Sequence, residues 1–151
     1  MKFKRELLNG FIIFIGIAIY FAILELLGMS NNSFFRLLNI LIVGYGVNRT
    51  IKGNVENGIG GYFKNFASGF ITSTIGAVLS ISALLIYIYF NGGEAYLKTL
   101  AEGFLIGGGE VSSYQYTFAL LLFESSAGSF IVVYCLMQYW KGKVEVINKV
   151  D

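Results

Sequence analysis

The sequence predicts an all-α integral membrane protein, a four-helix bundle with an amphipathic helix on its outer side. Apolar stretches of the length that crosses about 30 Å of hydrocarbon recur along the chain. Charged residues make up only 13% of the 151 residues, whereas soluble domains carry about a quarter. The Lys and Arg residues gather near the ends of the apolar stretches, as interfacial anchors do. We therefore expect the lipid bilayer to surround this chain. A net charge of +2 without a basic patch indicates no nucleic-acid partner.

The first two spans are expected at residues 8–27 and 34–47. The first follows a charged start similar to that of a signal peptide, but it is too long, and Glu25-Leu26-Leu27-Gly28 stands where a cleavage site would lie. We interpret it as a retained helix. The second is short and is diluted by Arg36 and Asn39, so we expect neighbouring helices to shelter it.

The third and fourth spans are expected at residues 66–90 and 116–140, which are rich in aliphatic and aromatic residues. The loop between them, residues 91–115, is predicted to contain an amphipathic helix. Its charged residues repeat every four positions and its apolar residues cover another face: Glu94, Lys98 and Glu102 against Tyr96, Leu97, Leu100, Phe104 and Leu105. We expect this helix to lie on the outer leaflet or to cap the bundle, between glycine joints at 92–93 and 107–109. Binding of a partner is the alternative.

The cations predict the orientation of the spans, because Lys and Arg resist translocation during membrane insertion. Arg36 and Lys98 fall on one side of a four-span arrangement. Nine fall on the other side: Lys2, Lys4, Arg5, Arg49, Lys52, Lys64, Lys141, Lys143 and Lys149. We therefore expect both termini on the cytoplasmic side and the loop 91–115 outside.

Glu124 is the residue that most suggests chemistry. Helical rise places it about 12 Å inside the fourth span, where an ionised carboxylate is costly without a partner. Ser125, Gly128 and Ser129 follow it; such small residues predict close helix packing and offer hydroxyls to the carboxyl group. Two interpretations stay open. Glu124 binds a proton or cation in a cavity, or it is a neutral or paired group that holds the helices together.

Candidate partners of Glu124 lie in the first two spans. Arg36 is the best-placed counter-ion inside the membrane, although Glu25 competes for it across a short turn. If Glu25 takes Arg36, Glu124 is left protonated, bonded to Asn39 or Tyr45, or in contact with water. The candidate ion or proton site therefore consists of Glu124, Arg36, Asn39, Tyr45 and Glu25.

Small residues recur every four positions in the third span, at Ser68, Thr72, Gly76 and Ser80. A stripe of this kind allows helices to pack closely in lipid. We expect it to pack inside the monomer, because the short second span needs a close neighbour. A contact between copies of the chain is the alternative.

The residue inventory excludes several chemistries. The chain has no His, its only Asp is Asp151, and its only Cys is Cys135. It therefore lacks the commonest general base, an aspartyl dyad and a cysteine metal site. No Gly-x-Ser-x-Gly, Walker A or HExxH pattern occurs. We expect no enzyme activity, no catalytic residue, no metal and no cofactor.

Several loose motifs along the chain resemble the DUF4199 family. They follow a charged start and a first span that contains glycine, and they are Phe35-Arg36-x-x-Asn39, Tyr62-x-x-x-Phe66-x-x-Gly69-Phe70, Ile86-Tyr87, and Phe123-Glu124 with Met137-Gln138-Tyr139. The family consists of small four-helix membrane proteins of unknown function, mainly from Bacteroidota. The resemblance implies a bacterial inner membrane and carries over no catalytic or binding residue.

The sequence favours a non-enzymatic membrane module. It would be an accessory or assembly subunit of a membrane complex or a module that associates with itself, because the loops are short and no extramembrane domain is large enough to act alone. Its partners would be the lipid bilayer, further copies of itself or other membrane proteins. The alternative is a small proton- or cation-linked transporter or channel that uses Glu124. Since four helices enclose little space, that function would require a homo-oligomer.

Overall fold

The computed structural model describes residues 3–30, 32–101 and 113–146. Over these residues the chain is helical and contains no strand. The helices are α1 (Phe3–Leu26), α2 (Ser33–Leu37), α3 (Asn39–Glu56), α4 (Tyr62–Phe90), α5 (Gly93–Ala101) and α6 (Tyr114–Val146). The predicted all-α class is therefore confirmed for the described part of the chain.

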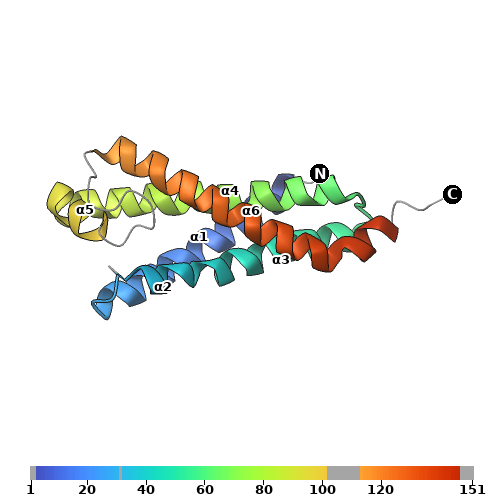
Figure 1. The fold of residues 1–151 in the computed structure, drawn as a ribbon, viewed down its shortest axis with the longest axis horizontal. Coiled ribbons are helices and arrows are strands. Elements are labelled where there is room, and N and C mark those ends of the chain that lie inside the picture. The colour runs from blue at the N-terminus through green and yellow to red at the C-terminus, as the bar shows by residue number, and fades with distance from the viewer. Residues whose placement is uncertain (1–2, 31, 102–112, 147–151) are drawn as a thin grey trace.

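Four long helices, α1, α3, α4 and α6, lie side by side along the length of the molecule (Figure 1). α4 packs extensively against α1 and α6, and α3 contacts all three of these helices. The start of α1, the turn between α3 and α4, and the end of α6 lie toward one end of the molecule, while α2 and α5 lie at the other. The start of α1 and the end of α6 thus lie toward the same end of the molecule.

Three helices are long and apolar enough to cross a membrane: α1, α4 and Tyr114–Glu145 of α6. They contain the third and fourth predicted spans and all of the first except its last residue, and each begins earlier than predicted. The helices continue past the apolar stretches because adding a residue to an existing helix is much easier than starting one. Polar residues beyond the apolar stretch therefore extend each helix instead of ending it.

The second predicted span differs from the helices that form. The helical path is interrupted at Leu38, between α2 and α3, and α3 continues to Glu56, well beyond the predicted end at residue 47. Hydropathy did not predict this extension of α3, because polar residues such as Thr50 and Asn54 lower the mean hydropathy of the stretch. Both residues are nevertheless buried on the inward face of α3, where neighbouring helices bond them in place of water.

Glycines with positive φ close α1 and α3. Gly28 (φ 67°) and Gly58 (φ 70°) each follow the end of a helix, and this left-handed backbone is readily adopted only by glycine. The residue after each glycine donates its N–H to a carbonyl of the last helical turn: Met29 to Leu24 at 2.9 Å and Ile59 to Asn54 at 2.9 Å. These caps have the Schellman pattern. They reverse the chain within a few residues and so let successive helices pack side by side.

α1 and α4 approach each other closely where both carry glycine. A Cβ atom on Gly76 would lie 2.6 Å from Ile13 Cγ2 and 3.2 Å from the Gly10 carbonyl oxygen, and one on Gly10 would lie 3.0 Å from the Thr72 carbonyl oxygen. No side chain fits at either position. The small-residue stripe of α4 therefore faces α1 within one copy of the chain over Ser68, Thr72 and Gly76, all of which are buried.

Two apolar clusters hold α6 in place. One joins α4 and α5 to the first half of α6 through Ile81, Ile88, Leu97, Leu100 and Leu121. The other joins α3 to the second half of α6 through Val47, Ile51, Val133, Met137, Trp140 and Val144. The amphipathic helix forms over α5 and turns its leucines inward, so it caps this end of the helices. Its predicted continuation through Glu102, Phe104 and Leu105 to the glycine joint at 107–109 lies outside the described residues.

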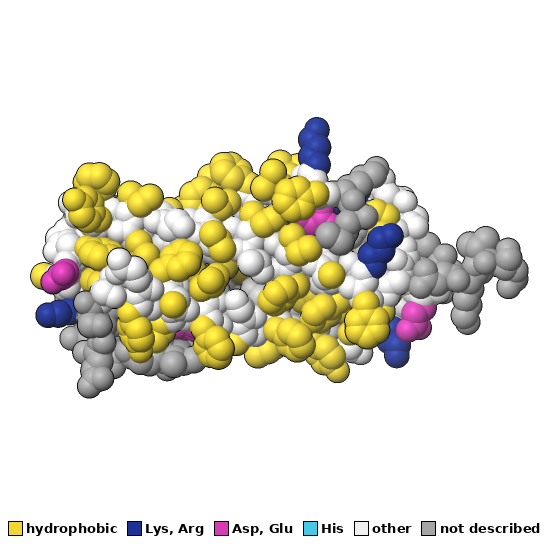
Figure 2. All heavy atoms as spheres, turned by 90° about the horizontal axis from the view of Figure 1, so that it is seen from above, with side chains coloured by type: hydrophobic (Ala, Val, Ile, Leu, Met, Phe, Trp, Pro, Cys, Tyr) yellow, Lys and Arg dark blue, Asp and Glu magenta, His cyan; other side chains and the backbone are white. Residues whose placement is uncertain are grey.

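The sides of the molecule are apolar. Figure 2 shows hydrophobic side chains over the middle of one face, with charged side chains gathered toward its ends. In the most apolar window of each of the three long helices, only 22% to 28% of the residues are buried. Large hydrophobic side chains are exposed along α1 at Leu7, Leu8, Phe11, Ile15, Ile19 and Ile23. Soluble monomers rarely expose apolar surface that is continuous on this scale.

Candidate functional site

A cluster of polar side chains lies buried between α1, α3 and α4. Residues three or four positions apart project from one face of a helix, and each helix contributes such a pair. None of the six residues is more than 2% exposed: Glu6 and Asn9, Thr50 and Asn54, and Ser68 and Thr72. Buried polar groups are costly unless they are bonded to one another, so the bonds within this cluster determine whether the three helices can meet.

One chain of hydrogen bonds ends at the Glu6 carboxyl group. Arg5 Nη1 donates to Asn54 Oδ1 at 2.6 Å, and Asn54 Nδ2 donates to Ser68 Oγ at 2.9 Å. Ser68 Oγ in turn donates to Glu6 Oε1 at 2.5 Å. The chain runs from α1 to α3, from α3 to α4, and from α4 back to α1, so it ties the three helices into a closed loop.

A second set of hydrogen bonds lies beside the first. Asn9 Nδ2 donates to Thr50 Oγ1 at 2.9 Å, and Thr50 Oγ1 lies 3.0 Å from Thr72 Oγ1 and 3.2 Å from the Gly46 carbonyl oxygen. Thr72 Oγ1 donates to the Ser68 carbonyl oxygen at 2.9 Å. Each threonine hydroxyl can thus donate to the carbonyl four residues earlier in its own helix, and either one can be the donor between the two hydroxyls. The threonines thus bond within the cluster and need no water.

Glu6 is the ionisable member of this cluster, and one of its oxygens has no partner. Its side chain is fully buried, and its Oε2 atom is buried without a hydrogen bond. The neighbouring Arg5 donates to Asn54, and within the described residues no ion pair joins Arg5 to Glu6. The cluster therefore holds a carboxyl group in a fixed orientation, with Oε1 bonded and Oε2 unused.

Glu124, the residue singled out from the sequence, also carries a buried oxygen without a partner. This atom is Oε2, on a side chain that projects from α6. Arg36 of α2 lies within electrostatic range of Glu124, so the structure brings the predicted counter-ion into the neighbourhood of this carboxyl group. Asn39, at the start of α3, likewise has a buried Oδ1 atom without a partner.

Glu25 has surroundings that the sequence did not indicate. Its Oε1 atom accepts a hydrogen bond from Tyr96 Oη at 2.6 Å, which fastens α5 to the end of α1. Burial raises the pKa of the Tyr96 hydroxyl, and the hydrogen bond to Glu25 raises it further. Glu25 therefore serves the docking of α5, whereas the sequence suggested that it competes for Arg36.

Tyr45 lies far from Glu124. It is 60% exposed and lines a shallow groove between α3 and α6 together with Leu41 and Cys135. Cys135 is about 16 Å from Glu124 along α6 by helical rise. Of the alternatives that the sequence left open for Glu124, a bond to Tyr45 is therefore not made, because the two side chains lie at different heights along the bundle.

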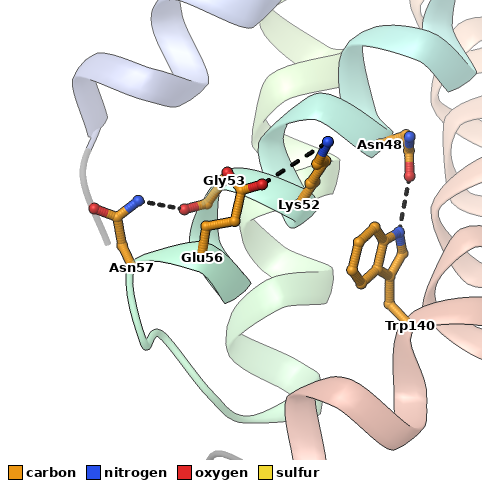
Figure 3. A network of polar contacts seen from close by, with 6 residues as sticks. All are labelled: Asn48, Lys52, Gly53, Glu56, Asn57 and Trp140. Atoms are coloured by element: carbon orange, nitrogen blue, oxygen red, sulfur yellow. Dashed lines mark hydrogen bonds and ion pairs between the residues drawn. The ribbon is translucent and has the colours of Figure 1, made fainter.

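The end of the molecule that holds the termini carries polar contacts between α3 and α6 (Figure 3). Trp140 Nε1 donates to Asn48 Oδ1 at 2.8 Å, and Lys143 Nζ lies 4.6 Å from the centre of the Trp140 ring, a cation–π geometry. Lys52 and Glu56 form an exposed ion pair of 3.8 Å, which contributes little to stability. The bond between Trp140 and Asn48 therefore joins α6 to α3 at this end of the molecule.

The residues of α6 predicted to pack against another helix fall into two groups. Ser129 is buried and Ser125 is half-buried. A Cβ atom on Gly128, by contrast, would meet no atom within 4 Å. Gly128 therefore does not serve packing within one copy of the chain.

On α4, Ser80 at the end of the predicted stripe has a buried hydroxyl without a partner.

The sequence did not point to Glu6, Asn9, Thr50 or Asn54. Glu6 directly follows Lys4 and Arg5, Asn9 is a single polar residue near the start of the first predicted span, and Thr50 and Asn54 lie beyond the end of the second. The sequence signal that could have identified this cluster is the spacing of its polar residues. Pairs of polar residues recur three or four positions apart on the inward faces of helices that otherwise carry apolar residues.

No family model, no curated protein and no solved structure matches the chain. Within the residues that the structure describes, no group of three or more His, Cys, Asp or Glu residues could hold a metal ion. The candidate site therefore consists of two carboxyl groups that each hold a buried oxygen without a partner, Glu6 in its hydrogen-bonded cluster and the half-buried Glu124 near Arg36.

Proposed function

We propose that the chain is a four-span protein of a bacterial cytoplasmic membrane, with both termini in the cytoplasm. Three helices long and apolar enough to cross a membrane, apolar sides and a shared end for the two termini support this proposal. The DUF4199 resemblance implies the same setting. The cations at the end that holds the termini fit the positive-inside rule: Lys4, Arg5, Arg49, Lys52, Lys64, Lys141 and Lys143.

In this proposal α2 and α3 together form the remaining span. Residues 33–56 would extend about 36 Å as helix, which is enough to cross the hydrocarbon. The polar groups of α3 bond to α1 and α4, while Ile40, Leu41 and Tyr45 are exposed. A helix of this composition is stable in lipid only when its neighbours satisfy its polar groups.

We further propose that the protein is a non-enzymatic module, either an accessory or assembly subunit of a membrane complex or a module that associates with itself. The observation that carries this function is the close approach of α1 and α4 at Gly10 and Gly76, which leaves no path between these helices. The exposed apolar sides are then the surfaces available to partners. The groove between α3 and α6 at Tyr45 and Cys135 is one of them.

The mass of the native assembly tests this function. The protein is extracted from the membranes of its own host with a mild detergent or in native nanodiscs, and the intact particle is weighed by mass spectrometry. An assembly is expected, either with a companion protein or as several copies of the 16.7 kDa chain. A single copy without a companion at every extraction condition would contradict the proposal.

A second candidate function is proton- or cation-linked transport through Glu124. It is favoured by the buried, unpartnered oxygen of Glu124 and by the nearby Arg36. Proton flux into liposomes that contain the protein is measured with an internal pH dye under an imposed gradient. Transport predicts that Glu124→Gln abolishes the flux and that Glu94→Gln, on the exposed face of α5, preserves it. Equal flux in the two variants excludes this role for Glu124.

A further inference from the structure

We infer that the cluster between α1, α3 and α4 is a proton-binding site, in which Glu6 is a neutral carboxylic acid with its proton on Oε2. The ligand is one proton, taken from water and returned to it. This site is separate from Glu124, and it does not depend on whether the protein assembles or transports.

The direction of the hydrogen bonds assigns the proton to one oxygen. Asn54 accepts from Arg5 through Oδ1 and therefore presents its Nδ2 donor to Ser68. Since Ser68 Oγ accepts this bond, its own proton points to Glu6 Oε1. Oε1 is therefore an acceptor, and Oε2 is the oxygen that can carry a proton.

The surroundings of Oε2 favour the neutral acid. An ionised carboxylate shares its charge between both oxygens, and each then needs a donor when it is buried. The amide and hydroxyl donors of the cluster are directed elsewhere, and Oε2 is buried without a partner. A proton removes the charge and needs no additional space, whereas a metal ion would need several further oxygen ligands around Oε2.

The described charged groups on α1, α3 and α4 do not stabilise an ionised Glu6 carboxylate in place of the proton. On α1, Arg5 is half-buried and donates to Asn54. On α3 and α4 the partners that reach the cluster are uncharged amides and hydroxyls. The ionisable side chains on the same stretches are exposed at the surface: Lys4 on α1, Arg49, Lys52 and Glu56 on α3, and Lys64 on α4. Lys52 and Glu56 are moreover paired with each other.

Infrared difference spectroscopy of the purified protein tests the proposal directly, because a protonated carboxyl group shows a C=O band that a carboxylate lacks. Spectra of the wild type and Glu6→Gln are recorded in detergent at neutral pH. The expected result is the loss of one carboxyl group's intensity in Glu6→Gln, with the full band kept in Glu56→Gln as the matched exposed control. An unchanged band in Glu6→Gln would overturn the proposal, since Glu6 would then be ionised.

A second variant keeps the test decisive if Glu6→Gln fails to fold. Ser68→Ala removes the donor to Oε1 and leaves the proton on Oε2. The Glu6 band is then expected to remain and to move to higher wavenumber, because a C=O group with one fewer hydrogen bond vibrates at higher frequency. Disappearance of the band, or a band at its original position, would contradict the assignment.

Discussion

Single side chains decide how α1, α3 and α4 meet. Asn54 is the clearest case, because its amide group bonds to Arg5 on α1 and to Ser68 on α4 at the same time. An amide can do this since it carries an acceptor and two donors on one planar group. One fully buried residue therefore joins all three helices.

Asn54→Ala is expected to lower the free energy of unfolding by about 2 kcal/mol, because it leaves buried partners unsatisfied. The measurement is equilibrium unfolding of the purified protein in mixed micelles. Asn91→Ala provides the control, since Asn91 is exposed and bonds only to the carbonyl of Tyr87 in its own helix. A loss at Asn54 no larger than the loss at Asn91 would show that the cluster does not join the helices.

Tyr96 gives the docking of α5 a dependence on pH. Because burial and the bond to Glu25 raise the pKa of Tyr96 in the folded chain, the folded state keeps this proton to higher pH than the unfolded state. The resulting stability is complete below the ordinary tyrosine pKa of about 10 and is lost as the pH rises further. We expect the melting temperature of Tyr96→Phe to fall less than that of the wild type across this alkaline range.

The matched control for Tyr96 is Tyr89→Phe, because Tyr89 is mostly exposed at the end of α4. This variant is expected to follow the alkaline curve of the wild type. If Tyr96→Phe shows the same alkaline loss as the wild type and Tyr89→Phe, the Tyr96 hydroxyl has no part in the effect.

At the scale of elements, glycine sets the distance between α1 and α4. Gly76→Ala is expected to destabilise the protein by about 1 to 3 kcal/mol, because the new methyl group overpacks a full contact against Ile13. Gly128→Ala is the matched control. It lies within α6 in open space and is expected to change stability by less than about 1 kcal/mol. Unfolding in mixed micelles measures both variants, and equal effects would contradict the close contact.

Hydropathy predicted α1, α4 and α6 because each contains a predominantly apolar stretch long enough to form a span. It could not predict the full extent of α3, since Thr50 and Asn54 lower the hydropathy of a helix whose polar groups are satisfied by neighbours. The turn glycines Gly28 and Gly58 were visible in the sequence, but their capping bonds depend on backbone conformation.

The candidate site was predictable only in part. Arg36 and Glu124 could be named as partners because charges inside apolar stretches stand out. The Glu6 cluster could not, because it exists only after three helices have packed and its members look ordinary one at a time. The link between Glu25 and Tyr96 was missed for the same reason, as it joins residues far apart in the sequence.

At the scale of the whole molecule, the proposed four-span arrangement is supported by the apolar sides and by the shared end at which α1 begins and α6 ends. The weakest element of this arrangement is α3, which composition alone does not mark as a span. Its polar face is covered by α1 and α4, and the proposed crossing of α3 therefore depends on the packing of the folded protein.

Cysteine labelling across the membrane tests this four-span arrangement. In a Cys135→Ser background, single cysteines replace Met29 before α2, Asn57 after α3 and Glu94 on α5, and intact spheroplasts are treated with an impermeant maleimide. Met29→Cys and Glu94→Cys are expected to react, while Asn57→Cys reacts only after the membrane is permeabilised. Equal reaction of Met29→Cys and Asn57→Cys in intact spheroplasts would place both ends of α3 on one side and contradict the four-span arrangement.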